Sequence, residues 1–485
     1  MFEQVLPNLN YSDEEANNTA IIDFSERPRR ILSFKEIHRY TVAIAKMLTD
    51  IGYKRGDKIS IIGLNSFKYI AVYLGIRLAG MTPVVINHKL SGQQIHYVIT
   101  HSETRFVFHD EEFLPLLPRT VPTANLNTID KWLILSDSEF EFIDDPHQTA
   151  LMLYTSGSTG TPKCISVSAE SRQWSIKVMP GYPQKARTII AQPLSHINAL
   201  NVVDITIRNK SPLVLLPKFT VELYKHAILK AKVARIPAIP SMLAMLLQND
   251  SNVEEMKSSN VKRIMLSGAP TSEKLYDRIQ EAFPNAGISI TFGMSESGPG
   301  VFDIFGEIPR MSVGRAKEGN EYKLIDDVLW IKTPGLFSGY YKDDDKTNES
   351  YDSDGFFNTR DKFRVDENGF YYFIGRADDM FVSGGENIYP GEVEETLNNH
   401  PHIIDSCVIG LDDDIKGTKA YAFVLMDKDV PENEIQDWYA ENGPAYQIPR
   451  RIWKLDEFPV TFINKIDRRA LTELAKKLLA ESSSE

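Results

Sequence analysis

The chain has 485 residues, a formal net charge of −12 at pH 7 and 42% hydrophobic residues. This length allows a large core and favours two or more domains. The excess of acidic residues provides no general basic surface, so we expect no nucleic-acid partner. The sequence contains no run of 18 apolar residues, so we also expect no transmembrane helix and no membrane partner.

Cysteine and histidine usage narrows the class further. Two cysteines, Cys164 and Cys407, cannot form a disulfide framework and fit a reducing cytosol, so we expect a cytoplasmic protein. The N-terminus carries acidic residues instead of a basic region and an apolar run, which disfavours a signal peptide. The histidines form no H-E-x-x-H motif or Cys/His cluster, which disfavours structural zinc. A homodimer is compatible with the sequence.

The first 300 residues alternate short apolar runs with helical patterns. We expect strands at 58–63, 83–86, 105–108, 187–191, 213–216, 262–266 and 288–292. We expect helices at 67–79, 92–100, 199–208, 221–231, 241–248 and 272–283. Such alternation favours βαβ units and parallel strands, and it predicts two similar α/β sheets.

The last third of the chain differs in composition and pattern. Residues 301–374 are rich in glycines, aromatic residues and turn signals, which is typical of antiparallel β structure. A compact tail follows, with elements expected at 392–398, 406–410 and 420–425. We therefore predict an α/β fold. Its large N-terminal domain, residues 1–377, has two α/β sheets and a β-rich subdomain, and its small α+β C-terminal domain covers residues 378–485.

The most informative segment is residues 154–163, YTSGSTGTPK, which follows an apolar run that predicts a strand. Glycines permit a close approach of the backbone, and hydroxyl, N–H and ammonium groups suit a polyphosphate. The common P-loop is excluded because Gly160 is followed by Thr161, Pro162 and Lys163, and not directly by lysine. A solvated surface loop is the competing interpretation of this segment alone.

Five further segments favour the polyphosphate-binding interpretation over the surface loop. They read SGAP at 267–270, TFGMSESG at 291–298, NTRD at 358–361, GRADDMFVSGGENIYP at 375–390 and PVTFINK at 459–465. A charged residue in any one of them would ordinarily be a solvated surface charge. In this order and spacing the six segments closely resemble the adenylate-forming superfamily of acyl- and aryl-CoA synthetases, carrier-protein adenylation domains and luciferases. The resemblance covers essentially the whole chain.

The resemblance implies that the protein activates a carboxylic acid with ATP and Mg²⁺, giving an acyl-adenylate and pyrophosphate. The loop would embrace the β- and γ-phosphates, and Glu296, together with Thr155, would hold the metal. The loop residues assigned to the nucleotide are Thr155, Ser156, Gly157, Ser158, Thr159, Gly160 and Lys163.

The other nucleotide contacts follow from the same resemblance. Gly268, Ala269 and Pro270 would line the adenine pocket, beside Phe292, which would stack on the base, and Gly293 and Met294. Ser295 would bond the α-phosphate. Asp361 would accept the ribose hydroxyls, and Arg376 would contact ribose or phosphate. Arg360 stands where the family usually has glycine.

Lys465 resembles the lysine of the adenylation step, whose ammonium relieves the repulsion between an attacking carboxylate and a phosphate. The family usually has glycine at the position of Asn464. Asp378 falls at the family hinge, about which the small domain rotates between half-reactions. His196 matches a position that gates the carboxylate, and a satisfied structural histidine is the alternative.

The acceptor is indicated by residues 383–390, which look like the CoA-ligase form of this segment. Gly384 and Gly385 would border the pantetheine tunnel. We therefore expect an acid–CoA ligase with CoA as co-substrate. A stand-alone enzyme that loads a carrier-protein phosphopantetheine shares all six segments, and a nucleotide-binding member without turnover is a third hypothesis.

The acid-binding pocket is expected near residues 198–202, 267–268 and 294–300. These residues are small or apolar, so we expect an aliphatic or aryl acid without a strong charge of its own. Asp204 is expected to be structural or solvated.

Overall fold

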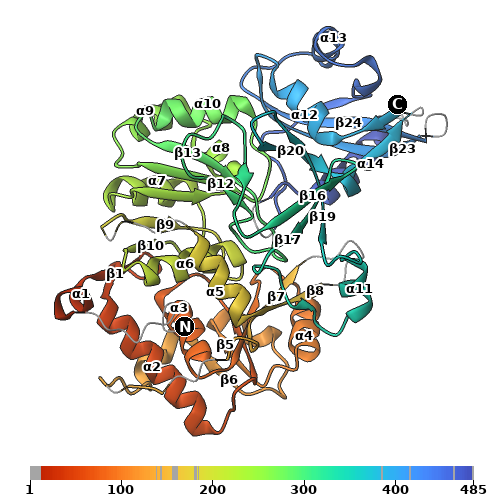
Figure 1. The fold of residues 1–485 in the computed structure, drawn as a ribbon. Coiled ribbons are helices and arrows are strands. Elements are labelled where there is room, and N and C mark those ends of the chain that lie inside the picture. The colour runs from red at the N-terminus through yellow and green to blue at the C-terminus, as the bar shows by residue number, and fades with distance from the viewer. Residues whose placement is uncertain are drawn as a thin grey trace.

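The computed structural model describes residues 12–137, 139–141, 145–155, 162–179, 183, 185–383, 386–413, 417–461 and 465–482. Two α/β layers form the N-terminal part, and a β-rich part joins them to a smaller C-terminal part (Figure 1). The predicted fold class is therefore confirmed. Within the described ranges, no helix combines the length and apolarity needed to cross a membrane.

The first sheet has seven strands in the order β18-β8-β7-β4-β3-β5-β6. Strands β3 to β7 are parallel neighbours, whereas β8 and β18 pair antiparallel at one edge. Its strands are β3 (Lys58–Ile62), β4 (Thr82–Ile86), β5 (Phe106–His109), β6 (Thr123–Asn125), β7 (Thr149–Thr155), β8 (Lys163–Ser168) and β18 (Gly339–Tyr340). The nearby helices are α3 (Phe67–Leu78), α4 (Gly92–His101), η2 (Glu111–Leu116) and η3 (Leu126–Lys131).

The second sheet has the order β13-β12-β11-β9-β10-β1-β2, with only β2 antiparallel. Its strands are β1 (Thr19–Asp23), β2 (Arg30–Ser33), β9 (Thr188–Ile190), β10 (Leu213–Leu215), β11 (Arg235–Ala238), β12 (Arg263–Ser267) and β13 (Gly287–Thr291). Its helices are α1 (Asp13–Asn17), α2 (Phe34–Ile51), α6 (Ile197–Arg208), α7 (Val221–Lys230), α8 (Pro240–Leu246), α9 (Asp250–Lys257) and α10 (Glu273–Ala282). Helix α5 (Ala169–Val178) contacts β7 and β8 of the first sheet and also α6. Because Ser267 pairs with Thr291, the segments after β12 and β13 leave the same edge of the sheet.

The β-rich part is an antiparallel sheet of order β14-β15-β20-β19-β17-β16. Its elements are β14 (Phe302–Asp303), β15 (Gly314–Ala316), β16 (Glu321–Ile325), β17 (Val328–Lys332), α11 (Asp344–Glu349), β19 (Phe357–Val365) and β20 (Phe370–Arg376). The register pairs Asp361 with Arg376, so two predicted site residues face each other across neighbouring strands. The turn η4 (Ala377–Asp379) follows directly.

The C-terminal part has its own sheet and apolar core. Its elements are β21 (Phe381–Ser383), β22 (Glu386–Ile388), α12 (Pro390–Asn398), β23 (Ile403–Asp413), β24 (Gly417–Met426), α13 (Glu432–Asn442), η5 (Ala445–Gln447), β25 (Ile452–Lys454) and α14 (Arg468–Ser482). It lies beside α10 and β20 (Figure 1). The Lys274 ammonium donates to the carbonyls of Pro401 (3.1 Å) and Ile403, and Lys362 donates to the Tyr389 hydroxyl (2.8 Å). The domain boundary at Asp378 stays a prediction.

A buried ionic cluster joins helices α3, α5 and α6. The Asp204 carboxylate forms salt bridges with Arg77 at 2.9 Å and with Arg172 at 2.8 Å, and all three side chains are at most 1% exposed. Of the two expectations for Asp204, the structural one is correct and the solvated one is wrong. A charge this far from water requires partners, and here one carboxylate compensates two guanidinium groups.

We expect Asp204→Asn to destabilise the protein by about 3–5 kcal/mol, because it removes the charge of the carboxylate that both buried guanidinium groups contact. Equilibrium urea unfolding followed by tryptophan fluorescence measures this loss. The matched control is Asp250→Asn, which breaks an exposed pair with Arg278 and should cost less than about 1 kcal/mol. Equal effects of the two substitutions would contradict a structural role for the buried cluster.

Candidate active site

The predicted site residues converge where the two α/β sheets, the β-rich sheet and the C-terminal part meet. The electrostatic fields of Lys465, Asp361, Arg376 and Glu296 act on one another, and Glu296 also acts on Lys163. Segments from distant parts of the sequence are thus brought into one charged cluster. Its members carry both signs, which is the arrangement that a polyanionic ligand with a metal ion requires.

Glu296 follows β13 and is enclosed by the β18 region. The Tyr340 hydroxyl donates to its Oε1 at 3.0 Å, and its backbone carbonyl accepts from the Phe337 N–H at 2.7 Å. Burial raises the pKa of the Glu296 carboxyl, while the hydrogen bond from Tyr340 and the charges of Arg376 and Lys163 oppose that rise. The described residues contain no cluster of three or more metal-ligating side chains. Mg²⁺ is commonly bound through one or two carboxylates plus substrate phosphates, so Glu296 fits that role.

Lys163 opens β8 opposite Thr155, at the two ends of the predicted phosphate loop. Burial lowers its pKa to about 8, assisted by the positive charges of Lys346 and Arg360 and opposed by Glu296. The ammonium groups of Lys163 and Lys346 lie 6.0 and 5.9 Å from the centre of the Tyr340 ring. These neighbouring cations repel one another in the free protein, and a bound anion would relieve the repulsion. Sequence reasoning missed Lys346 and Tyr340, which lie in none of the six segments.

Several predicted residues lie outside the described part of the chain. These are Ser156, Gly157, Ser158, Thr159 and Gly160 of the phosphate loop, and Gly384 and Gly385 of the segment assigned to pantetheine. Their roles stay predictions.

The segment after β12 begins at Gly268, whose φ of +84° is in the left-handed region that favours glycine. Ala269 and Pro270 continue this segment. A Cβ at Gly268 would lie 3.5 Å from Cε of Lys465, so the lysine reaches this edge from the C-terminal part. The predicted adenine-pocket segment and the predicted adenylation lysine are therefore adjacent.

The segment after β13 forms a tight turn. Met294 forms an isolated antiparallel bridge with Gly298, and the Met294 N–H donates to Ser297 Oγ at 3.2 Å. A Cβ at Gly293 would lie 2.8 Å from the Gly298 carbonyl oxygen, so no side chain fits there. Ser295, within this turn, directly precedes Glu296, and both are half-buried.

Phe292 belongs to an aromatic cluster. Its ring centre lies 4.9 Å from that of Phe363 in an edge-to-face arrangement and 5.9 Å from that of Phe302. It also lines the cavity described below. Its stacking on adenine stays a prediction.

Asp361 is 6% exposed, and Arg376 Nε lies 3.8 Å from its Oδ1. Burial raises the pKa of Asp361 to about 7, against the opposing effect of Arg376 and Lys465. The preceding residue, Arg360, has a φ of +59°, the left-handed conformation that a glycine would adopt without strain. The turn that the family glycine would make is thus kept by an arginine, whose guanidinium lies 3.3 Å from Asp378.

Lys465 is held by two hydrogen bonds to Thr461: its carbonyl accepts from the Thr461 N–H at 2.6 Å, and its own N–H donates to Thr461 Oγ1 at 3.3 Å. Burial lowers the pKa of its ammonium, and Arg376 adds to this effect, whereas Asp361 and Glu296 oppose it. His196 precedes α6, and burial together with the charge of Lys465 lowers its pKa to about 4. The imidazole is therefore neutral at physiological pH, close to the lysine.

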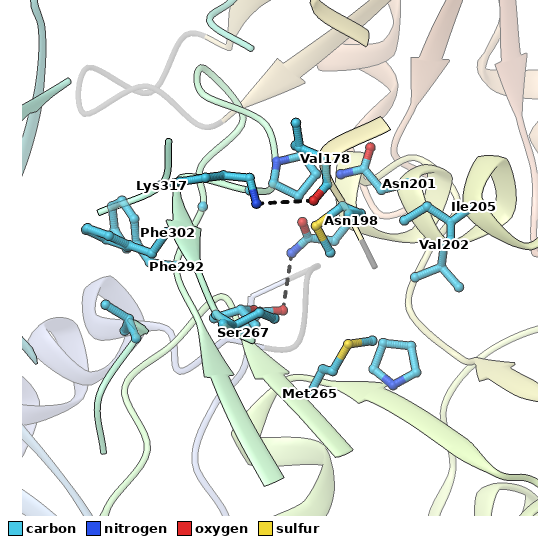
Figure 2. Close-up of a pocket in the computed structure, with 18 of the residues that line it drawn as sticks. Val178, Asn198, Asn201, Val202, Ile205, Met265, Ser267, Phe292, Phe302 and Lys317 are labelled. Atoms are coloured by element: carbon cyan, nitrogen blue, oxygen red, sulfur yellow. Dashed lines mark hydrogen bonds between the residues drawn. The ribbon is translucent and has the colours of Figure 1, made fainter. Parts of the chain in front are cut away.

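A cavity opens between α6 and the strand ends of β12 and β13 (Figure 2). The predicted wall residues Asn198, Asn201, Val202, Ser267, Pro299 and Gly300 line it, and so do Met265, Phe302, Phe305 and Lys317, which were not predicted. The walls are mainly apolar, but Lys317 places an ammonium in one of them. The expectation of small or apolar walls is therefore incomplete.

Comparisons with known proteins agree with this geometry. The family model described as AMP-binding enzyme matches residues 10–341, and the model of the AMP-binding enzyme C-terminal domain matches residues 392–465. A 2-succinylbenzoate–CoA ligase of Bacillus cereus is 26% identical over 465 residues, covering 92% of this chain and 94% of that protein.

Two solved structures have the same fold over nearly the whole chain. The o-succinylbenzoate CoA synthetase from Bacillus subtilis, in complex with its acyl-adenylate intermediate, is 25% identical with a TM-score of 0.82, and 97% of each chain is covered. The anthranilate CoA ligase AuaEII, in complex with anthranoyl-AMP, is 23% identical with a TM-score of 0.88, covering 98% of this chain and 97% of that one. Since the first family model alone spans more than half of the sequence, the chain belongs to the AMP-binding enzyme family.

Proposed function

We infer that this enzyme is an AMP-forming acid–thiol ligase. It activates a carboxylic acid with ATP, releasing pyrophosphate, and transfers the acyl group from the acyl-adenylate to the sulfur of CoA, releasing AMP. The observation that carries the proposal is the insertion of Lys465, from the C-terminal part, among Asp361, Arg376 and Glu296 of the N-terminal part. The names of the relatives, which are CoA ligases, support the same reaction.

The first half-reaction requires an anionic carboxylate to attack the α-phosphate. The buried Lys465 ammonium is positioned beside Gly268 and Asp361, where it would contact both anions and stabilise charge as it develops. Lys163, Lys346 and Arg360 provide positive charge for the β- and γ-phosphates. Bound Mg²⁺ would supply further charge neutralisation at Glu296. The neutral His196 adds no charge of its own near the carboxylate.

The second half-reaction requires space for a thiol where Lys465 now lies. We propose that the C-terminal domain, residues 378–485, rotates at Asp378. The rotation would break the contacts of Asp378 with Arg360 (3.3 Å) and Arg376 (3.8 Å) and those of Lys274 with the β23 region. These are polar, mostly exposed contacts, which cost little to break in water.

CoA is the proposed acceptor, on the resemblance of residues 383–390 to the CoA-ligase pattern and on the names of the relatives. A carrier-protein phosphopantetheine is the second candidate. We place the reaction in the cytoplasm, since Cys164 and Cys407 are both buried and free. Assembly as a homodimer stays a hypothesis.

AMP release tests the proposal directly. Aliphatic, aryl and succinylbenzoate-type acids are incubated with ATP and Mg²⁺, with and without CoA. We expect AMP release that depends on CoA. Pyrophosphate exchange without acceleration by CoA would favour the carrier-protein alternative, and the absence of AMP with every acid would favour a nucleotide-binding member without turnover.

Lys465→Ala should slow adenylation by roughly 10²–10³-fold, the usual loss when one positioned electrostatic donor is removed. Thioester formation from supplied acyl-adenylate should be largely spared, because the lysine acts only in the first half-reaction. Single-turnover measurements of each half-reaction separate the two effects. The matched control is Lys454→Ala, in the same part of the chain, whose exposed lysine pairs with Asp429. An equal loss in both half-reactions would refute this role for Lys465.

Asp361→Asn should lower activity and raise stability above neutral pH. The pKa of Asp361 is about 7 in the folded protein and 3.8 in its unperturbed form, so the folded state retains a proton that the unfolded state releases between these values. Stability contributed at this position is therefore lost as the pH rises from about 4 to about 7.

In the asparagine variant, residue 361 stays uncharged at every pH, so it contributes no such loss of stability. We expect its thermal midpoint to exceed that of the wild type at pH 8 by more than at pH 5.5, while its KM for ATP rises because an amide cannot accept from both ribose hydroxyls as a carboxylate does. A variant that is less stable at pH 8 would show that Asp361 is compensated in the free protein.

A further inference from the structure

The acyl cavity contains a cation that the adenylation chemistry does not use. Lys317 follows β15, and its half-buried side chain lines the cavity. Its ammonium donates to the Val178 carbonyl at 3.2 Å and lies 5.7 Å from the centre of the Phe305 ring. Across the described ranges, no carboxylate forms an ion pair with Lys317. An ammonium in a largely apolar wall calls for an anionic partner.

A second donor lies on the same side of the cavity. Asn201 is 4% exposed, and its Oδ1 accepts a hydrogen bond from Arg172. A guanidinium group can only donate, so the amide is fixed with its oxygen toward Arg172. Its Nδ2 is buried without a hydrogen-bond partner among the described residues. Figure 2 shows this nitrogen on the side that faces Val178 and Lys317.

The amide of Asn201 rests against a fixed, fully buried guanidinium group. Arg172 is held in place by Asp204 at 2.8 Å, and Asp204 is shared with Arg77. Because Arg172 cannot turn away, the Asn201 nitrogen stays on the side of the cavity.

We propose that the acid carries a second carboxylate, which binds Lys317 and Asn201 while the first carboxylate reacts beside Lys465. The ammonium–carboxylate contact is a charge-assisted hydrogen bond, and the Asn201 amide donates the second. Apolar side chains, among them Met265, Phe292 and Phe302, line the rest of the cavity and suit an aliphatic or aryl spacer. In Figure 2, Lys317 reaches toward Val178 in the upper part of the view, whereas Ser267 lies below Asn198. The proposal rests on the proposed acid-activating function.

This proposal replaces the expectation of an acid without a strong charge of its own. Segments 198–202, 267–268 and 294–300 contain no charged residue except Glu296, which is assigned to the metal. The cation comes from a different part of the chain, beyond all three.

Matched pairs of acids test the proposal. α,ω-Dicarboxylates of increasing length, and aryl acids with a carboxylate-bearing side chain, are compared with analogues in which a methyl group replaces the second carboxylate. We expect kcat/KM for AMP release to favour the dicarboxylate of each pair at the best length. Lys317→Met should lower kcat/KM for the dicarboxylate by roughly 10–10²-fold, the range for one hydrogen bond to a charged group, and should affect the monocarboxylate much less. Lys332→Met, on the exposed side of β17, is the matched control.

Asn201→Asp tests the amide donor of Asn201 separately from its structural role as an acceptor for Arg172. The aspartate still accepts from Arg172, so the buried cluster keeps its partner, but the donor is replaced by a negative charge. We expect an unchanged or higher thermal midpoint and a larger loss of turnover for the dicarboxylate than for its monocarboxylate partner.

Equal preference within each acid pair, or an equal loss for both acids in Lys317→Met, would overturn the second-carboxylate proposal while leaving the ligase function intact. The absence of AMP with every acid would instead overturn the proposed function. In that case thermal stabilisation of the wild type by the dicarboxylate, compared with Lys317→Met, still decides the cavity proposal. Stabilisation that disappears in the variant supports it, and stabilisation that is equal or absent in both refutes it.

Discussion

The burial of one ammonium group, that of Lys465, between two parts of the chain organises the rest of the site. An isolated ammonium would be expelled from this environment or lose its proton, and burial does lower its pKa. Asp361 and Glu296 make the charged form tolerable, while Arg376 opposes it. The two carboxylates are themselves raised in pKa by burial, so the cluster is poorly compensated in the free protein. ATP and a metal ion would supply the missing charges, so nucleotide binding would stabilise the charged form of Lys465 in its present position.

The buried Arg77–Asp204–Arg172 cluster connects the fold to the selection of the acid. It joins three helices, and its cost in desolvation is offset by the carboxylate that both guanidinium groups reach and by the Tyr73 hydroxyl, which accepts from both. The same Arg172 fixes which end of the Asn201 amide faces the cavity. A side chain that never touches the ligand therefore determines whether the wall offers a donor or an acceptor. Stability and specificity share these atoms, so a change in one is expected to alter the other.

Local patterns predicted the regular elements well but not all of them. The strands and helices expected between residues 58 and 108 occur within one or two residues of their predicted ends, because buried runs and amphipathic periodicity are local properties. Helix α2 was missed, although Ser33 and Glu36 form a capping box that marks its start. Strands β16 and β17 were not predicted individually within the segment expected to be antiparallel. They form a hairpin, with β16 at the edge of the sheet, and β17 reaches the rest of the sheet only through its pairing with β19, which is more distant in sequence.

The site, too, contains residues that local sequence predicts and residues that only the folded structure reveals. Glu296, Asp361, Arg376 and Lys465 are readable because each belongs to a short segment with fixed spacing, and the structure brings them together. Tyr340, Lys346 and Lys317 belong to no such segment, and only the packing of β15 and β18 against the rest of the protein reveals them.

Arg360 illustrates why a motif and its geometry must be separated. The backbone there requires φ near +59°, which costs a non-glycine residue roughly 1–2 kcal/mol. The arginine is retained in that conformation beside Lys163, where its charge helps to lower the pKa of the lysine to about 8. Phosphate groups between these cations would reverse that effect and raise the pKa of Lys163 again. The strain at Arg360 is thus tied to positive charge at the site proposed for the outgoing pyrophosphate, a gain that glycine could not provide.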